Sequence, residues 1–279
     1  MIMIRALLYT SLVILFAVFF NHRISGQELY VFSSPASNVP ARSITAKASA
    51  KSLVSYHSSE REYRIMAELQ TGLSKNWMLS GGVSFSDMYF KKGQRFESIR
   101  LYTKYRFLSK DDVHRHFRMA AFVSGSWSRN PLVYQELTTE GDNNAIQAGV
   151  IATQLIRRLA VSGTLSHISI TGNPSKVEFG LPFYRNVFQY SLSGGYLIFP
   201  LKYTNYKQVN LNAYLELLGQ YAPSTGTGFI DAAPAIQLIF NSTTRVNLGA
   251  RFQLAGNFHR MANQSYLISV EHTMLNRWK

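Results

Sequence analysis

Apolar and polar residues alternate regularly between Val209 and Gly256. Apolar side chains occupy every second position from Val209 to Leu217, and the alternation returns in 230–240 and 246–254. Strict period-two alternation places one set of side chains on each face of a β-strand. Runs of roughly 11 residues are about twice the soluble average of about 5–6 and match the about 9–11 residues with which a tilted strand crosses a bilayer. The pattern is typical of an outer-membrane barrel.

The same alternation recurs along most of the chain and predicts twelve strands in all. The expected strands cover residues 43–52, 63–71, 77–87, 98–108, 117–128, 145–155, 159–170, 187–199, 209–218, 230–240, 245–254 and 265–275. Twelve is an even number, as expected for a single-chain bacterial barrel. The predicted fold class is all-β, a transmembrane antiparallel up-and-down β-barrel of about twelve strands. Pro234 cannot donate to a strand ladder, so we expect a bulge or a local break there.

The connections between these strands alternate between short and long. Those around 73–76, 156–158 and 241–244 are tight, whereas those around 129–144 and 171–186 are long. Outer-membrane barrels have short turns on the periplasmic side and longer loops outside. Both termini of the barrel are therefore expected on the periplasmic side.

The first 26 residues have the composition of a secretory signal peptide. A basic start containing Arg5 precedes the 15-residue apolar run 6–20, and a polar stretch ends in small residues before Gln27. A membrane anchor would need about 20 apolar residues, so a signal peptide that is cleaved after export is the better interpretation. The predicted organisation is a signal peptide over 1–26, an extended periplasmic lead-in over 27–42 and an outer-membrane barrel over 43–279.

Three stretches resemble a known group of proteins. They are Glu28–Ser43, Lys104–Arg118 and Asp231–Ser242, and they look like the corresponding parts of an uncharacterised family of outer-membrane barrels from Bacteroidota-type bacteria. The resemblance spans nearly the whole mature chain. It implies a barrel in a Gram-negative outer membrane. It brings no established activity, so it transfers no functional residues.

Composition agrees with this fold and narrows the functional classes. The mean hydropathy of −0.06 is near zero, as expected for a barrel that shows lipid only every second residue. The chain has 16 Tyr and 18 Phe for interfacial girdles and no Cys for disulfides or thiolate metal sites. A net charge of +14 would suggest nucleic acid in a cytosolic protein. Because the basic residues are scattered among strands and turns, we expect no nucleic-acid partner.

If the apolar set faces lipid, the alternating polar set faces the lumen. The candidate pore-lining residues are Arg64, Glu68, Arg100, Lys104, Arg106, Arg118, Glu216, Asp231, Arg245, Arg251 and Glu271, and Lys47 and Lys51 share their face. Two interpretations stay open. Buried Arg and Glu side chains can pair across a narrow bore and fill it, which is the simpler interpretation. A lumen rich in Arg and Lys can instead select anions, and the excess of bases over acids favours this second interpretation.

Two short motifs are compatible with other chemistry. His114 and His116 follow an Asp pair in a predicted periplasmic turn, where solvated polar residues are expected more often than a metal site. His167 and Ser169 resemble the His-x-Ser of outer-membrane phospholipases, with Asn186 as a candidate for orienting the histidine. The residues after the serine depart from the phospholipase pattern, so we do not expect catalysis.

The leading hypothesis is a narrow outer-membrane pore or transporter that passes small polar solutes, anions among them. The first alternative is a structural or ligand-binding barrel with a plugged lumen, whose loops 130–144 and 171–185 contact ligands or partners. A lipid acyl hydrolase is the third hypothesis, but the protein is not expected to be an enzyme, and no cofactor or metal is expected. Expected partners are outer-membrane lipid, lipopolysaccharide, a small polar solute and the barrel-assembly machinery during biogenesis.

Overall fold

A computed structural model describes residues 30–56, 59–89, 93–113, 115–171, 184–200 and 208–278. The expected signal peptide over 1–26 lies outside these ranges. None of the described segments forms a helix long and apolar enough to span a membrane.

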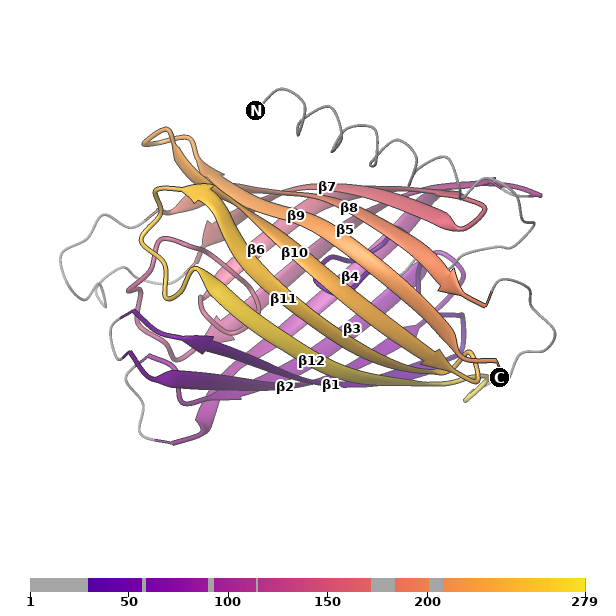
Figure 1. Cartoon of the computed structure of the whole chain (residues 1–279), viewed down its shortest axis with the longest axis horizontal. Coiled ribbons are helices and arrows are strands. Elements are labelled where there is room, and N and C mark those ends of the chain that lie inside the picture. Colours follow the sequence, from indigo (N-terminus) through magenta and orange to yellow (C-terminus); the bar gives the residue numbers. More distant parts are fainter. Residues whose placement is uncertain are drawn as a thin grey trace, which may run out of the picture.

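Twelve antiparallel strands close into a single barrel, as the sequence predicted (Figure 1). The strands are β1 (Ile44–Val54), β2 (Arg61–Gly72), β3 (Trp77–Ser86), β4 (Arg95–Asp112), β5 (Arg115–Ser128), β6 (Ala145–Ile156), β7 (Leu159–Ile170), β8 (Asn186–Phe199), β9 (Asn210–Ala222), β10 (Thr227–Phe240), β11 (Thr244–Gly256) and β12 (Gln264–Met274). Each strand pairs with its neighbours in sequence, and β1 pairs with β12. Closure leaves no sheet edge whose N–H and C=O groups would lie unpaired in lipid.

Alternation along the strands separates an apolar outer face from a polar inner face. In β7, Val161 and Leu165 are exposed on the outside, whereas Ser162 and Ser166 are buried on the inside. The same division holds on β9, where Leu215 is exposed and Glu216 beside it is fully buried. An apolar outer face against a polar interior is the arrangement that a bilayer requires of a barrel.

The two ends of the barrel differ in their connections. Ile44 pairs with Met274, so β1 begins and β12 ends at the same end of the barrel, which also carries the tight turns 73–76, 157–158 and 241–243. We call this the turn end. The opposite end, which carries the long connection 129–144, is called the loop end.

β4 is longer than expected, running from Arg95 to Asp112 rather than over 98–108. Its pairing with β5 continues past a bulge between Arg106 and Leu108 and extends the hairpin at the turn end. Local sequence gave no signal for this extension, because alternation is lost where the bulge shifts the register.

β10 runs through Pro234 without ending. The proline is paired on the β9 side, whereas the pairs with β11 lie on either side of it, at Ala232 and Ala235. The register shift in this ladder lies earlier, between Ile230 and Asp231. The proline therefore interrupts one ladder locally, since it has no N–H to donate.

The lipid-facing role of the outer side chains gives a test of membrane insertion. Leu192 lies at the middle of β8 and is 55% exposed. We expect Leu192→Arg to lower the unfolding free energy by about 2–4 kcal/mol, because a charged group at the bilayer midplane loses its hydration. Denaturant unfolding of the refolded barrel in lipid vesicles measures this change.

Leu73 provides the matched control, since it is also 55% exposed but lies in the turn between β2 and β3. Leu73→Arg should cost about 0–1 kcal/mol, as for a charge near the interface. Equal effects of the two substitutions would contradict the placement of the barrel in the bilayer.

Candidate functional site

The segment before β1, expected in the periplasm as a lead-in over 27–42, has its described part inside the barrel. We call residues 30–42 the inner segment. Its first anchor is Glu216 of β9, which is fully buried. The Glu216 carboxylate accepts main-chain N–H groups from Val31 and Phe32 at 2.9 Å and from Ser33 at 2.8 Å. Hydrogen bonds to an ionised acceptor are strong, so this carboxylate holds the segment against the wall.

The second anchor of the inner segment is basic. The ammonium group of Lys104 on β4 donates to the main-chain carbonyls of Pro35 and Ser37, each at 2.7 Å. Arg118 on β5 donates to the hydroxyl of the same Ser37 at 2.9 Å. Two carbonyl oxygens and one hydroxyl in the middle of the segment thus bind cations of the barrel wall.

Further contacts carry the inner segment along the wall to β1. Thr153 of β6 accepts the N–H of Ala36 at 2.9 Å, and the N–H of Arg42 bonds to the carbonyl of Gly72 at 2.7 Å. A Cβ at Gly72 would lie only 2.2 Å from the carbonyl oxygen of Pro40. Only glycine at position 72 therefore lets the segment lie this close to β2. The segment therefore follows the inner wall near the turn end from β9 round to β1.

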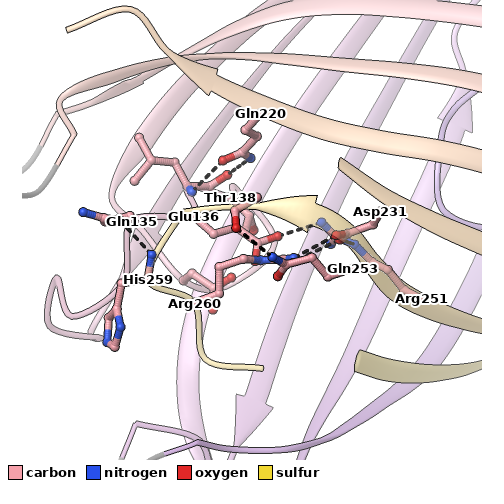
Figure 2. Close-up of polar contacts among 12 residues, drawn as sticks. Gln135, Glu136, Thr138, Gln220, Asp231, Arg251, Gln253, His259 and Arg260 are labelled. Atoms are coloured by element: carbon pink, nitrogen blue, oxygen red, sulfur yellow. Dashed lines mark hydrogen bonds and ion pairs between the residues drawn. The ribbon is translucent and has the colours of Figure 1, made fainter. Parts of the chain in front are cut away.

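The long loop 129–144 folds into the other end of the lumen, where an ion network holds it (Figure 2). Glu136 of the loop binds Arg251 of β11 at 2.9 Å and Arg260, which follows β11, at 2.8 Å. Asp231 of β10 accepts from the same two guanidinium groups, from Arg260 at 2.8 Å. The Arg260 guanidinium also lies 3.9 Å from the ring centroid of Phe229. Each of the four charges therefore faces at least two opposite charges.

Further hydrogen bonds hold the same loop across the opening at the loop end of the barrel (Figure 2). Gln220 of β9 bonds to Leu137, accepting its N–H at 3.0 Å and donating to its carbonyl at 2.6 Å. The Gln135 N–H donates to the His259 carbonyl at 2.9 Å, and the His259 N–H donates to the side-chain oxygen of Gln135 at 2.7 Å. The loop thus spans from the β5–β6 side to the β9 side and to the connection between β11 and β12.

A second ion cluster holds the end of this loop against β2 and β4. Arg64, which is 2% exposed, binds Glu97 at 2.7 and 2.9 Å and also binds Asp142 of the loop. Asn130 donates to Glu97 at 2.6 Å. Gly141 has a φ of +130°, and a Cβ there would lie 2.8 Å from a Glu97 oxygen. Glycine is needed at this position both for its backbone angle and for the close approach.

Two acids of the loop, Glu136 and Asp142, have lowered pKa values. Burial raises the pKa of Glu136, but the guanidinium groups of Arg260 and Arg251 outweigh it and hold that pKa well below its ordinary 4.5. Burial likewise raises the pKa of Asp142, and the Arg64 guanidinium outweighs it and lowers the pKa. A lowered pKa in the folded state contributes stability that is complete above the unfolded value and is lost as pH falls through the folded one.

Smaller polar clusters lie on the wall between the inner segment and the loop 129–144. Glu271 of β12 binds Arg245 at 2.9 Å and Lys47 at 3.6 Å. Glu68 of β2 accepts hydrogen bonds from Ser80 and from Gln70, the latter at 3.0 Å. These pairs lie on the wall formed by β1, β2, β3, β11 and β12.

A cavity of about 440 Å³ remains between the inner segment and the loop. It reaches from Thr45 and Thr273 near the turn end to Thr138 in the loop. Its charged lining residues are Lys47, Lys51, Arg100, Lys104, Arg245, Arg251, Glu68, Glu136, Glu140 and Glu271. Six cations therefore face four carboxylates along this polar space.

The candidate residues divide into two groups. Those that line the cavity are Glu68, Arg100, Lys104, Arg245, Arg251 and Glu271. Of the others, Arg64, Arg118, Glu216 and Asp231 bind the inner segment or the loop cluster, and Arg106 donates to the Lys75 carbonyl at 2.8 Å near the turn end. Pairing of charges inside the barrel thus accounts for many of the candidate residues. Cationic side chains still outnumber carboxylates around the cavity.

Sequence reasoning missed four charged residues of the site: Glu97, Glu136, Asp142 and Arg260. Three lie in connections, where charged residues are usually solvated. Glu97 lies just before the expected start of a strand and does not follow its alternation. The Gly141-Asp142 pair in a long loop was the available signal, since glycine allows a close backbone approach.

The histidine motifs do not form reactive sites in the described residues. His114 lies outside those residues, and His116 binds Asp111 at 2.8 Å on the β4–β5 hairpin. Within the described ranges, no group of three or more His, Cys, Asp or Glu could hold a metal ion. His167 points outward and contacts the Phe188 ring edge-on at 5.4 Å. Ser169 pairs across the strands with Asn186.

Comparisons with known proteins place the fold among outer-membrane channels. A COG4313 outer membrane channel from Pseudomonas putida F1 is 11% identical, with 88% of this chain and 100% of that chain covered and a TM-score of 0.58. NanC porin is 11% identical (82% and 98% covered, TM-score 0.49), and KdgM porin is 12% identical (82% and 98% covered, TM-score 0.46). The likeness at these identities is one of fold.

Sequence comparison adds nothing to this structural likeness. No family model matches the chain, and no curated protein matches it. The similarity to outer-membrane channels rests on structure, and the resemblance to a Bacteroidota family stays a prediction.

The ion network around Glu136 should control the order of the infolded loop. We expect Glu136→Gln to weaken the attachment of residues 133–142 by on the order of 1–3 kcal/mol, because the buried guanidinium group of Arg260 and the partly buried one of Arg251 lose a charged acceptor. Hydrogen exchange of the loop amides measures this change. In the unmodified protein, protection should persist at pH 5 and decline only as pH falls below 4.5, the ordinary pKa of Glu136.

Glu140 gives a control within the same loop. Its side chain is 51% exposed and lies 3.6 Å from Arg100, an exposed pair worth about 0–1 kcal/mol. Glu140→Gln should leave loop protection nearly unchanged. Loop amides that exchange equally fast in both variants and in the unmodified protein would contradict the proposed role of the network.

Proposed function

We propose that this protein is an outer-membrane channel that passes small polar solutes, with a preference for anions. The main support for this proposal is the polar cavity between the inner segment and the infolded loop, where six Lys and Arg side chains face four Glu side chains. An excess of cationic groups along a narrow path attracts anions and repels cations. The likeness of fold to an outer-membrane channel supports the location.

Export and membrane placement belong to the same proposal. The chain would reach the outer membrane through a cleaved signal peptide over 1–26 and be inserted by the barrel-assembly machinery. The turn end would face the periplasm and the loop end the outside, as short and long connections do in such barrels. Membrane lipid and lipopolysaccharide would contact the apolar outer face.

A second candidate is a ligand-binding barrel with a closed lumen. The observation in its favour is that two elements fold inward, the inner segment on Glu216 and the loop on Arg251 and Arg260. Both elements narrow the bore from opposite ends. In this candidate, a solute would bind in the cavity without crossing the membrane.

Ion current through the refolded mature protein in a planar bilayer tests the channel. We expect a small, stable current whose reversal potential under a salt gradient shows anion preference. Lys51→Met with Arg100→Gln should move the anion-to-cation permeability ratio toward one, since both side chains line the cavity.

Lys110→Gln is the matched control, because Lys110 lies on the exposed β4–β5 hairpin outside the cavity. It should leave the permeability ratio unchanged. A folded barrel that carries no current would overturn the channel proposal and favour the ligand-binding barrel.

A further inference from the structure

The wall of the barrel packs against apolar side chains of the inner segment and forms most of its hydrogen bonds with the main chain. Four N–H groups, those of Val31, Phe32, Ser33 and Ala36, bond to Glu216 or to Thr153. The carbonyl oxygens of Pro35 and Ser37 bond to Lys104. The segment bends at residues 31–33 and at Ala36, so a ligand that takes its place would adopt the same bends. The hydrogen bonds themselves involve backbone groups that every peptide carries.

The binding surface also has a direction. The acidic anchor Glu216 meets the first residues of the segment, 31–33, and the basic anchors Lys104 and Arg118 meet residues 35–37. A carboxylate that accepts several N–H groups is also a partner for an ammonium group, and the Lys104 ammonium is a partner for a carboxylate. Arg118 binds Asp111 at 2.8 Å with one end of its guanidinium group and faces the segment with the other. The wall therefore matches the charges of a free peptide that runs in the same direction as the inner segment.

A free peptide can make bonds that the inner segment cannot. Residues 31 and 37 lie within a continuous chain, so the groups they present to the anchors are uncharged. A peptide of about seven residues would bring its terminal ammonium to Glu216 and its terminal carboxylate to Lys104 and Arg118. Each terminus would place a second, opposite charge beside an anchor that the inner segment meets only with neutral groups, which adds Coulomb attraction. The tethered segment competes with an effective concentration in about the mM range.

We propose that Glu216, Lys104 and Arg118 form a binding site for short, unblocked peptides, and that residues 31–37 occupy it as an internal competitor. The cavity borders the inner segment from Tyr30 to Pro40 and gives a ligand access to it. This inference rests on the proposed function, because it names peptides as the solute class of the same lumen.

Calorimetric titration of the mature protein in detergent micelles tests the site with a seven-residue peptide of Ala and Ser. The unblocked peptide should bind, and either N-acetylation or C-amidation should weaken binding about tenfold, because an opposite charge beside one anchor is replaced by a neutral group. Glu216→Gln should abolish the difference between the unblocked and acetylated peptides. Lys104→Met should reduce the difference between the unblocked and amidated peptides. Equal binding of blocked and unblocked peptides to the unmodified protein would overturn the proposal.

A reversible lock tests whether the inner segment competes. The hydroxyl oxygens of Ser33 and Ser193 lie 2.9 Å apart, and the chain has no native Cys, so Ser33→Cys with Ser193→Cys should allow a disulfide between segment and wall. Oxidation should abolish peptide binding, and a reductant should restore it. Thr45→Cys with Thr273→Cys is the control, because this pair, 2.8 Å apart, joins β1 to β12 without holding the segment.

The outcomes separate this site from the channel itself. Peptide binding that persists in the oxidised Ser33–Ser193 variant would overturn the site, whatever the ion current shows. A salt current with no peptide binding would likewise reject the peptide site and leave the channel intact. Peptide binding without a salt current would support the site and reject passage.

Discussion

Charged side chains inside the closed barrel must find partners, and the rest of the interior is arranged around this requirement. Removing an ion from water costs several kcal/mol unless opposite charges and hydrogen bonds compensate it. Glu216, Asp231 and Arg64 are among the most deeply buried residues of the protein. Each binds an element that comes from outside the strands, namely the inner segment, the connection after β11 or the loop 129–144, and Arg64 and Asp231 also bind a charged residue of another strand.

This compensation explains why the lumen is narrow without being filled. The inner segment follows the wall near the turn end, and the infolded loop crosses the mouth at the loop end. Between them, the wall keeps Lys47, Lys51 and Arg100 facing a polar cavity. The same charges that attach the two elements therefore also determine which solutes the remaining space would accept.

The strands were predictable because their signal is local. Alternation with a period of two is enforced at every residue by lipid on one side and a polar lumen on the other, so twelve strands could be placed from sequence. The pairing of Arg64 with Glu97 and Asp142 was not predictable, because it depends on the path of a loop. The position of the inner segment was missed for a related reason: its short sequence with two prolines lacks the alternation of a strand, and its anchors Glu216 and Lys104 lie far away in the chain.

Hydrogen exchange of the Val31, Phe32 and Ser33 amides in the refolded mature barrel tests most directly whether lumen charges hold the inner segment. If the buried carboxylate of Glu216 binds these three N–H groups, they should exchange slowly, and Glu216→Gln should make them exchange at least about tenfold faster, which corresponds to about 1.4 kcal/mol. Fast exchange of all three amides in the unmodified protein would place the segment outside the barrel and contradict this arrangement of the lumen.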